Sequence, residues 1–262
     1  MLKDEEIPDM QDIYIIEGAR TPVGVLQGSL SDVSAIDLGV VAAKGALERS
    51  GIDPQVVDQV VMGNVIQSSK DAIYFARHVA LKAGIPIETP ALTVNRLCGS
   101  GLQAIVSAAQ MLQLGEGEIA LAGGAENMTQ SPHVIRGARA GFKLGQTPQL
   151  EDSLWEALVD SYIGCGMAIT AENLAEKYGI SREEVDAYAL RSQRRHAGRS
   201  RPDCWPRKSF PSPSKIARAT PLSLLRTRVY ATPLWRRWRS FRRVSARAAS
   251  LPLAMRVASM TR

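Results

Sequence analysis

One cysteine in this 262-residue chain lies in a setting that suits a nucleophile. Cys98 follows a strand-like run at residues 91–95 and precedes residues 102–112, whose Ala, Leu, Ile and Gln content favours a helix. At a helix start, unpaired amides and the positive end of the dipole favour a thiolate and lower the thiol pKa. Gly99 and Gly101 keep bulk away from the sulfur. Attack on a substrate carbonyl is one interpretation; a small buried cysteine that packs a strand against a helix is the other.

A cysteine nucleophile needs a general base within hydrogen-bond reach, and the three histidines of the chain are poor candidates. His78 lies in an apolar helical pattern and is interpreted as a packed or surface residue. His133 follows a proline in a polar loop and His196 ends a charged helix, so both are expected to be solvated. Cys165 is interpreted as a buried structural thiol. No Cys or His cluster has metal-ligand spacing, so no metal site is predicted.

The elements that must position Cys98 have the pattern of an α/β domain. Apolar runs predict strands at residues 13–16, 56–62, 91–94 and 118–122, and helical periodicity predicts helices at 35–49, 72–83 and 102–112. Gly51 and Gly84 directly follow two of these helices, as a left-handed C-cap requires. The alternation of strands and helices predicts a mostly parallel sheet with helices on both faces.

Beyond residue 128 the pattern changes. Residues 129–150 are rich in Gly, Pro, Gln and Arg, which predicts an excursion over the surface. Helices are predicted at 153–159 and 171–178, and Ser181 with Glu184 forms a capping box for a third helix that runs through His196.

The string around Cys98 and five further blocks resemble the thiolases, enzymes that make or break the carbon bond next to an acyl thioester. The blocks are residues 94–105 (VNRLCGSGLQAI), 15–22 (IIEGARTP), 61–65 (VMGNV), 76–86 (ARHVALKAGIP), 122–129 (AGGAENMT) and 167–173 (MAITAEN). Their order and spacing agree with the family from about residue 12 to about residue 197. The resemblance implies an amino-terminal nucleophile domain at residues 1–128 and a partial loop domain at residues 129–197, with the carboxy-terminal domain absent.

Several functional expectations follow from that resemblance. Cys98 is expected to accept the acyl group, with coenzyme A thioesters as substrates and no separate cofactor. The family supplies a histidine, a second cysteine and an asparagine from its second half, so turnover by this chain is expected to be absent. Met167 is a candidate acyl-pocket residue, although Gly166-Met167-Ala168 stands where many short-chain members have His-Met-Gly. The resemblance also implies a homodimer or tetramer, whose formation by this chain is open.

The composition changes near residue 198. Residues 198–262 carry 16 basic residues against one acid, Asp203, whereas the whole chain has a net charge of only +6. Read from the third base of each codon, residues 201–211 permit AGLLAEEIVP and residues 250–262 permit TAGNASGINDA, both similar to thiolase sequence. We interpret the tail as a frameshifted, disordered segment. Its Arg and Trp pattern also allows nonspecific binding to nucleic acid or another polyanion.

Two functions of different classes therefore remain open: a thiolase-type acyltransferase by descent, and a noncatalytic fragment or interaction protein with a polyanion-binding tail. The amino terminus is acidic and polar and no apolar run approaches membrane-spanning length, so we expect a cytoplasmic protein with no membrane partner. The glycines at 99, 101, 123 and 124 do not form a GxGxxG loop, which argues against a nicotinamide cofactor.

Overall fold

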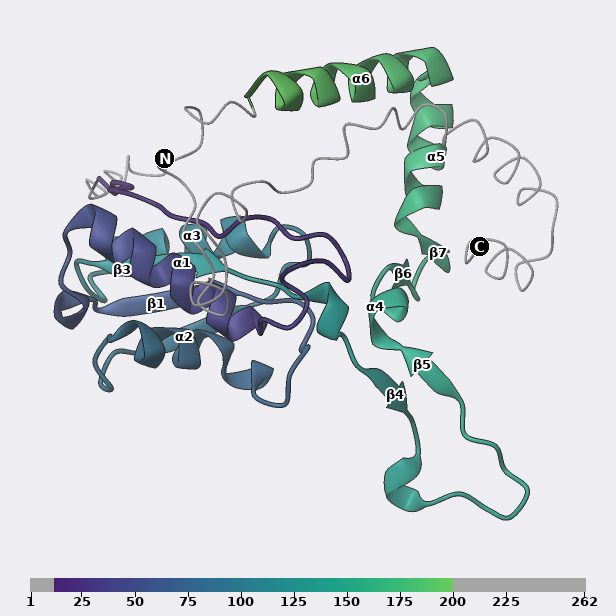
Figure 1. Ribbon diagram of the computed structural model, residues 1–262, viewed down its shortest axis with the longest axis horizontal. Coiled ribbons are helices and arrows are strands. Elements are labelled where there is room, and N and C mark those ends of the chain that lie inside the picture. The colour runs from purple at the N-terminus through teal and green to yellow at the C-terminus, as the bar shows by residue number, and fades with distance from the viewer. Residues whose placement is uncertain (1–11, 200–262) are drawn as a thin grey trace, which may run out of the picture. The chain divides into compact units, whose positions relative to one another are not determined.

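The computed structural model describes residues 12–199, and a three-stranded parallel sheet forms the centre of their first part (Figure 1). The strands are β1 (Gln59–Gly63), β2 (Ala91–Val94) and β3 (Ala120–Gly124). Their order is β2-β1-β3, with Val60 opposite Ala91 and Leu121. Because all three strands are parallel, their carboxyl ends meet at one edge of the sheet, where ligands bind in open α/β sheets.

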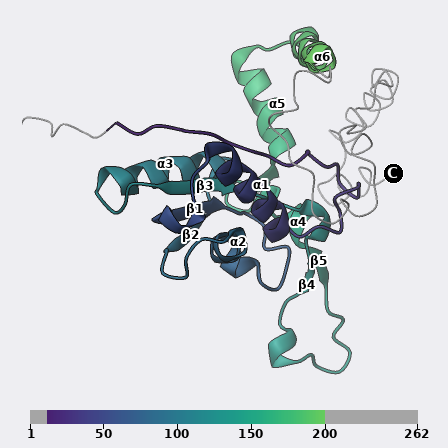
Figure 2. The same ribbon diagram turned by 60° about the vertical axis from the view of Figure 1, so that its left-hand side comes forward.

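Helices cover both faces of this sheet, which confirms the predicted α/β class (Figures 1 and 2). Two of them, α1 (Ala35–Ser50) and α2 (Phe75–Ala83), pack together and share one apolar cluster with Val60 and Met62 of β1. The third, α3 (Ser100–Gln113), packs on the opposite face, where Val61 meets alanines of the helix. Alternate residues of β1 therefore enter different clusters, as the twofold period of a strand requires.

Local signals define the helix ends. Ser34 caps α1 by accepting a hydrogen bond from the amide of Asp37, and Gly51 ends the helix with φ of 69°. Gly84 ends α2 in the same left-handed conformation, with φ of 95°. The sequence placed both ends correctly because the capping chemistry is local. A 3₁₀ turn, η2 (Ala72–Tyr74), occupies the first part of the expected helix at 72–83. A second, η1 (Pro54–Val56), ends at the first residue of the expected strand at 56–62, and β1 begins only at Gln59.

The predicted strand at residues 13–16 is wrong. These residues form no described strand, and their side chains are largely exposed, with Ile15 at 79 %. The apolar pattern was recognised correctly, but a strand also needs a neighbour for its backbone groups. Residues 13–16 and β3 line one groove together, yet no ladder joins them in the described part of the chain.

The second part of the described chain consists of short elements. Strand β4 (His133–Ile135) pairs antiparallel with β5 (Leu150–Asp152), and β6 (Val159–Asp160) pairs with β7 (Cys165–Gly166). The helices are α4 (Ser153–Glu156), α5 (Met167–Tyr178) and α6 (Arg182–Arg199), and η3 (Met128–Gln130) and η4 (Ala138–Ala140) are 3₁₀ turns.

The predictions for this second part are only partly confirmed. The capping box is confirmed, since Ser181 accepts a hydrogen bond from the amide of Glu184 and donates its own amide to the Glu184 carboxylate. The helix expected at 153–159 stops at Glu156, and α5 begins four residues earlier than expected, at Met167. No helix within residues 12–199 is long and apolar enough to cross a membrane. The basic tail, with its frameshift interpretation, lies outside the described residues.

Candidate active site around Cys98

Cys98 lies between the end of β2 and the start of α3, at the carboxyl edge of the sheet. Gly99 is the N-cap residue of α3 and Ser100 is its first residue, so Cys98 directly precedes the helix. The cysteine side chain is exposed and forms no disulfide. The structure therefore places Cys98 at a helix start, as the sequence predicted, with its side chain exposed.

A set of local hydrogen bonds holds the backbone before Cys98. Leu97 has φ of 49°, a left-handed conformation that is unfavourable for a branched side chain. The Leu97 amide donates to Oδ1 of Asn95 at 3.0 Å. The hydroxyl of Ser100 accepts from the Arg96 amide at 2.9 Å and donates to the Leu97 carbonyl at 2.7 Å. Asn95 and Ser100 thus hold Leu97 from both sides, and this determines where Cys98 points.

Glycines let α3 begin close to the sheet. A Cβ at Gly63, the last residue of β1, would lie 2.8 Å from the carbonyl carbon of Ser100. A Cβ at Gly124, the last residue of β3, would lie 2.6 Å from the Gly63 carbonyl oxygen. Real Cβ atoms do not approach so closely, so a larger residue at Gly63 would push the start of α3 away from the sheet, and one at Gly124 would push β3 away from the end of β1.

Glu126 lies just beyond the carboxyl end of β3 and accepts three hydrogen bonds. The donors are the Nδ2 of Asn64 at 3.0 Å, the Val65 amide at 2.9 Å and the Ile66 amide at 3.3 Å. Burial raises the pKa of this carboxyl, and the two amides and the Asn64 side chain oppose that effect. The same turn reaches the cysteine loop, because Nδ2 of Asn95 donates to the Val65 carbonyl at 3.4 Å.

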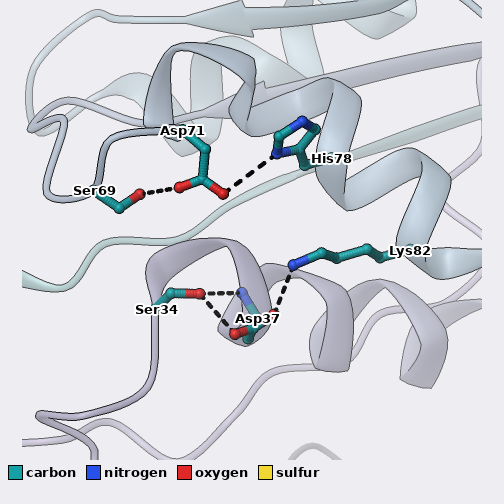
Figure 3. Close-up of polar contacts among 6 residues, drawn as sticks. All are labelled: Ser34, Asp37, Ser69, Asp71, His78 and Lys82. Carbon is teal, nitrogen blue, oxygen red and sulfur yellow. Dashed lines mark hydrogen bonds and ion pairs between the residues drawn. The ribbon is translucent and has the colours of Figure 1, made fainter.

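His78 is engaged on α2 (Figure 3). Its Nδ1 lies 3.5 Å from the carboxylate of Asp71, and its ring stacks on Tyr74. Ser69 donates to Asp71 at 2.6 Å, and this bond is the main cause of the lowered pKa of the Asp71 carboxyl. His78 is partly buried, which is consistent with the expected packed or surface histidine, and none of these contacts involves Cys98.

The remaining candidates lie in the second part of the chain. His133 belongs to β4, not to the loop that the sequence indicated, and His196 belongs to α6. Cys165 is half-buried and lies 3.8 Å from the hydroxyl of Thr170, so it is less buried than predicted. Met167 is the first residue of α5 and is 64 % exposed. No described contact joins any of these residues to Cys98, so the acyl-pocket role of Met167 stays a prediction.

No group of three or more potential metal ligands occurs among residues 12–199. An apolar groove among the described residues lies beside β3, α1 and the 13–26 segment and does not include Cys98. Cys98 lies at the carboxyl edge of the sheet, where ligands bind in open α/β sheets, whereas the lining of this groove contains no cysteine.

Comparison of the sequence and structure with known proteins identifies the family of the chain. The model of the thiolase N-terminal domain matches residues 13–202, almost three quarters of the chain. The chain belongs to the thiolase family. It is 53 % identical over 186 residues to human mitochondrial 3-ketoacyl-CoA thiolase, which covers 71 % of this chain and 47 % of the human protein. It is 44 % identical over 190 residues to the acetyl-CoA acetyltransferase of Pseudomonas aeruginosa, with the same shares of the two chains.

Solved thiolase structures agree with this assignment. The human mitochondrial 3-ketoacyl-CoA thiolase in complex with CoA superimposes with a TM-score of 0.69 at 54 % identity, covering 71 % of this chain and 47 % of the human one. The Bacillus anthracis acetyl-CoA acetyltransferase gives 0.66 at 42 % identity, covering 70 % and 46 %. This thiolase chain therefore spans about half the length of the relatives it matches.

The predicted cytoplasmic location is wrong. Relatives from human, Pongo abelii and Bos taurus, 51–53 % identical to this chain, are named mitochondrial 3-ketoacyl-CoA thiolases. The prediction rested on the absence of a secretory signal and of a membrane-length apolar run. Those features bear on secretion and membrane insertion, and they do not distinguish the cytoplasm from other soluble compartments.

Three polar residues near the Cys98 loop were not singled out from the sequence as candidate site residues. Asn64 and Asn95 directly follow β1 and β2, and Glu126 follows β3 by two residues. All lie at the carboxyl edge of a parallel sheet, so strand-end position was the signal that could have found them. Glu126 was visible within the AGGAENMT block, but its hydrogen bonds to a turn 60 residues away were not.

Proposed function

We propose that this chain carries the acyl-accepting half of a thiolase, with coenzyme A thioesters as substrates and no separate cofactor. The Sγ of Cys98, as a thiolate, attacks the thioester carbonyl carbon. The bond from that carbon to the coenzyme A sulfur breaks, and coenzyme A leaves as a thiolate that takes up a proton from solvent. The product is an S-acyl cysteine. The observation that supports this proposal is an exposed cysteine held immediately before α3 by Asn95 and Ser100.

The start of α3 suits the charge that develops in this step. When the thioester carbonyl becomes tetrahedral, its oxygen gains negative charge, and backbone amides at a helix start stabilise such an oxyanion. The amide of Cys98 is the donor that lies next to the reacting sulfur. The substrate carbonyl needs room there, and the glycines on the carboxyl side of Cys98 provide it.

Full turnover needs more than this half provides. Carbon–carbon bond formation or its reversal requires a general base and acid near the acyl group. Among residues 12–199, the described histidine contacts do not involve Cys98. We therefore propose acyl transfer to Cys98 without sustained thiolysis or condensation. By family membership we also propose that the chain forms a dimer or tetramer.

Intact-protein mass spectrometry after incubation with acetyl-CoA tests the proposal. We expect the mass of one acetyl group to be added, on a peptide that contains Cys98. Cys98→Ser should abolish the adduct, and Cys165→Ser should leave it in place. An adduct on Cys165, or none on the folded chain, would overturn the assignment of Cys98. Steady thiolysis of acetoacetyl-CoA that is lost in Cys98→Ser would refute the claim that this half lacks turnover.

A further inference from the structure

We propose that Glu126 is a positioning residue for Cys98, acting through the turn at residues 64–66 and through Asn95. This inference rests on the proposed role of Cys98 as the acyl acceptor. It does not require Glu126 to touch a substrate.

The first step of the argument is the turn after β1. Its two successive amides, from Val65 and Ile66, donate to different oxygens of one carboxylate, at 2.9 and 3.3 Å. The buried side chain of Asn64 donates to the same carboxylate and also to the Ala125 carbonyl, both at 3.0 Å. Two converging amides and one side-chain donor leave the turn little freedom while the carboxylate is present.

The second step joins this turn to the cysteine loop. The Asn64 amide donates to the Val94 carbonyl at 3.2 Å, and the Val65 carbonyl accepts from the side chain of Asn95. The other atom of that same amide group, Oδ1, accepts from the Leu97 amide. Leu97 is the residue with positive φ, and Cys98 comes next. A displaced turn would therefore release Asn95, relax Leu97 and move the sulfur away from the start of α3.

The third step separates positioning from simple support of the sheet. Asp58 precedes β1, at the opposite end of the strand, and its carboxylate accepts from the amides of Glu118 and Ile119 at 2.8 and 3.0 Å. It joins the same two strands as Glu126, by the same kind of bond. Within residues 12–199, no described hydrogen bond links Asp58 to the cysteine loop. Asp58 is therefore a matched control, because losing it weakens the sheet without touching the path to Cys98.

The experiment measures alkylation in the full 262-residue chain. Iodoacetamide labelling is followed by peptide mapping, and the Cys98 rate is divided by the Cys165 rate in the same molecule. Glu126→Ala is expected to lower this ratio by roughly threefold to tenfold, the size of effect that residues acting through a network produce. Glu126→Gln keeps one acceptor oxygen, so its labelling ratio should lie between those of the unaltered chain and Glu126→Ala. Asp58→Ala should lower the melting temperature and leave the ratio unchanged.

Asn95→Ala keeps the test decisive if Glu126→Ala fails to fold. It removes the link itself and should lower the ratio as much as Glu126→Ala, and the double variant Glu126→Gln with Asn95→Ala should be no worse than Asn95→Ala. An unchanged ratio in Asn95→Ala, or an equal fall in Asp58→Ala, would overturn the positioning role. Failure of the proposed function is distinguishable, because it would appear as no acetylation of Cys98 in the unaltered chain.

Discussion

The two parts of the described chain differ in how they hold their elements together. Residues 12–127 contain every described buried residue, arranged in clusters on both faces of one parallel sheet. Residues 128–199 contain helices and short hairpins, yet none of their residues is buried. Secondary structure in the first part is stabilised by packing, whereas in the second part it depends on capping, turn chemistry and local ion pairs, which contribute far less.

This contrast indicates why Cys98 and Met167 differ as site residues. Cys98 is attached to a packed helix and strand, and the side chains of Asn95 and Ser100 hold its loop. Met167 begins a helix that buries nothing within the described chain. A site needs a rigid support to fix its geometry. Within residues 12–199, the first part provides such support for the proposed nucleophile Cys98, and the second part provides less for Met167, the predicted acyl-pocket residue.

The largest expected difference between the two parts is in the rate of amide hydrogen exchange. Amides of β1, α2 and α3 should exchange more slowly than amides of α5 and α6 by orders of magnitude, because opening the packed part exposes its apolar clusters. Exchange followed by mass spectrometry at peptide resolution measures this. Equal protection of α5 would show that residues 128–199 pack against something and would end the contrast.

Side-chain truncation gives the next largest effect. Phe75 is fully buried in α2, so Phe75→Ala should lower the free energy of unfolding by about 3–5 kcal/mol. Tyr188 in α6 is 66 % exposed and is the matched aromatic control, since Tyr188→Ala should change stability by less than about 0.5 kcal/mol. Urea unfolding followed by circular dichroism measures both. Similar losses from the two variants would contradict the packing difference.

Much of the first part could be predicted from the sequence because its signals are local. The left-handed glycines at 51 and 84 fixed two helix ends, and the apolar runs at β2 and β3 located two strands. The strand expected at residues 13–16 failed because pairing is not a local property. For the same reason the sequence found Cys98 but not Glu126, whose hydrogen-bond partners lie about 60 residues away.

The two described cysteines allow the comparison to be tested on reactivity. Cys98 is exposed at a helix start, and Cys165 is half-buried beside Thr170. Alkylation by iodoacetamide at neutral pH should be faster at Cys98, on the order of tenfold. Timed labelling and peptide mapping measure both sites in one sample. Equal or slower labelling at Cys98 would remove the argument for an activated nucleophile in the packed part.

The smallest expected effect compares two carboxylates within the packed part. Backbone hydrogen bonds from Glu118 and Ile119 lower the pKa of Asp58, whereas burial raises the pKa of Glu126. Asp58 therefore contributes stability above its unfolded pKa, and this contribution is lost as the pH falls through the lower folded value. The contribution of Glu126 has the opposite pH dependence, because the folded chain holds the proton of this carboxyl more tightly. Stability therefore falls as the pH rises from the pKa of Glu126 in the unfolded chain to its higher pKa in the folded chain.

Urea titrations of Asp58→Asn and Glu126→Gln between about pH 3 and pH 7 separate these signs. Relative to the unaltered chain, Asp58→Asn should become less stable as the pH rises, because the charged form of Asp58 is the one that its two amides stabilise. Glu126→Gln should become relatively more stable over the same rise, because it removes a carboxylate that is costly to ionise when buried. If both differences changed in the same direction with pH, the two ends of the sheet would not differ electrostatically, and burial would not be what sets Glu126 apart from Asp58.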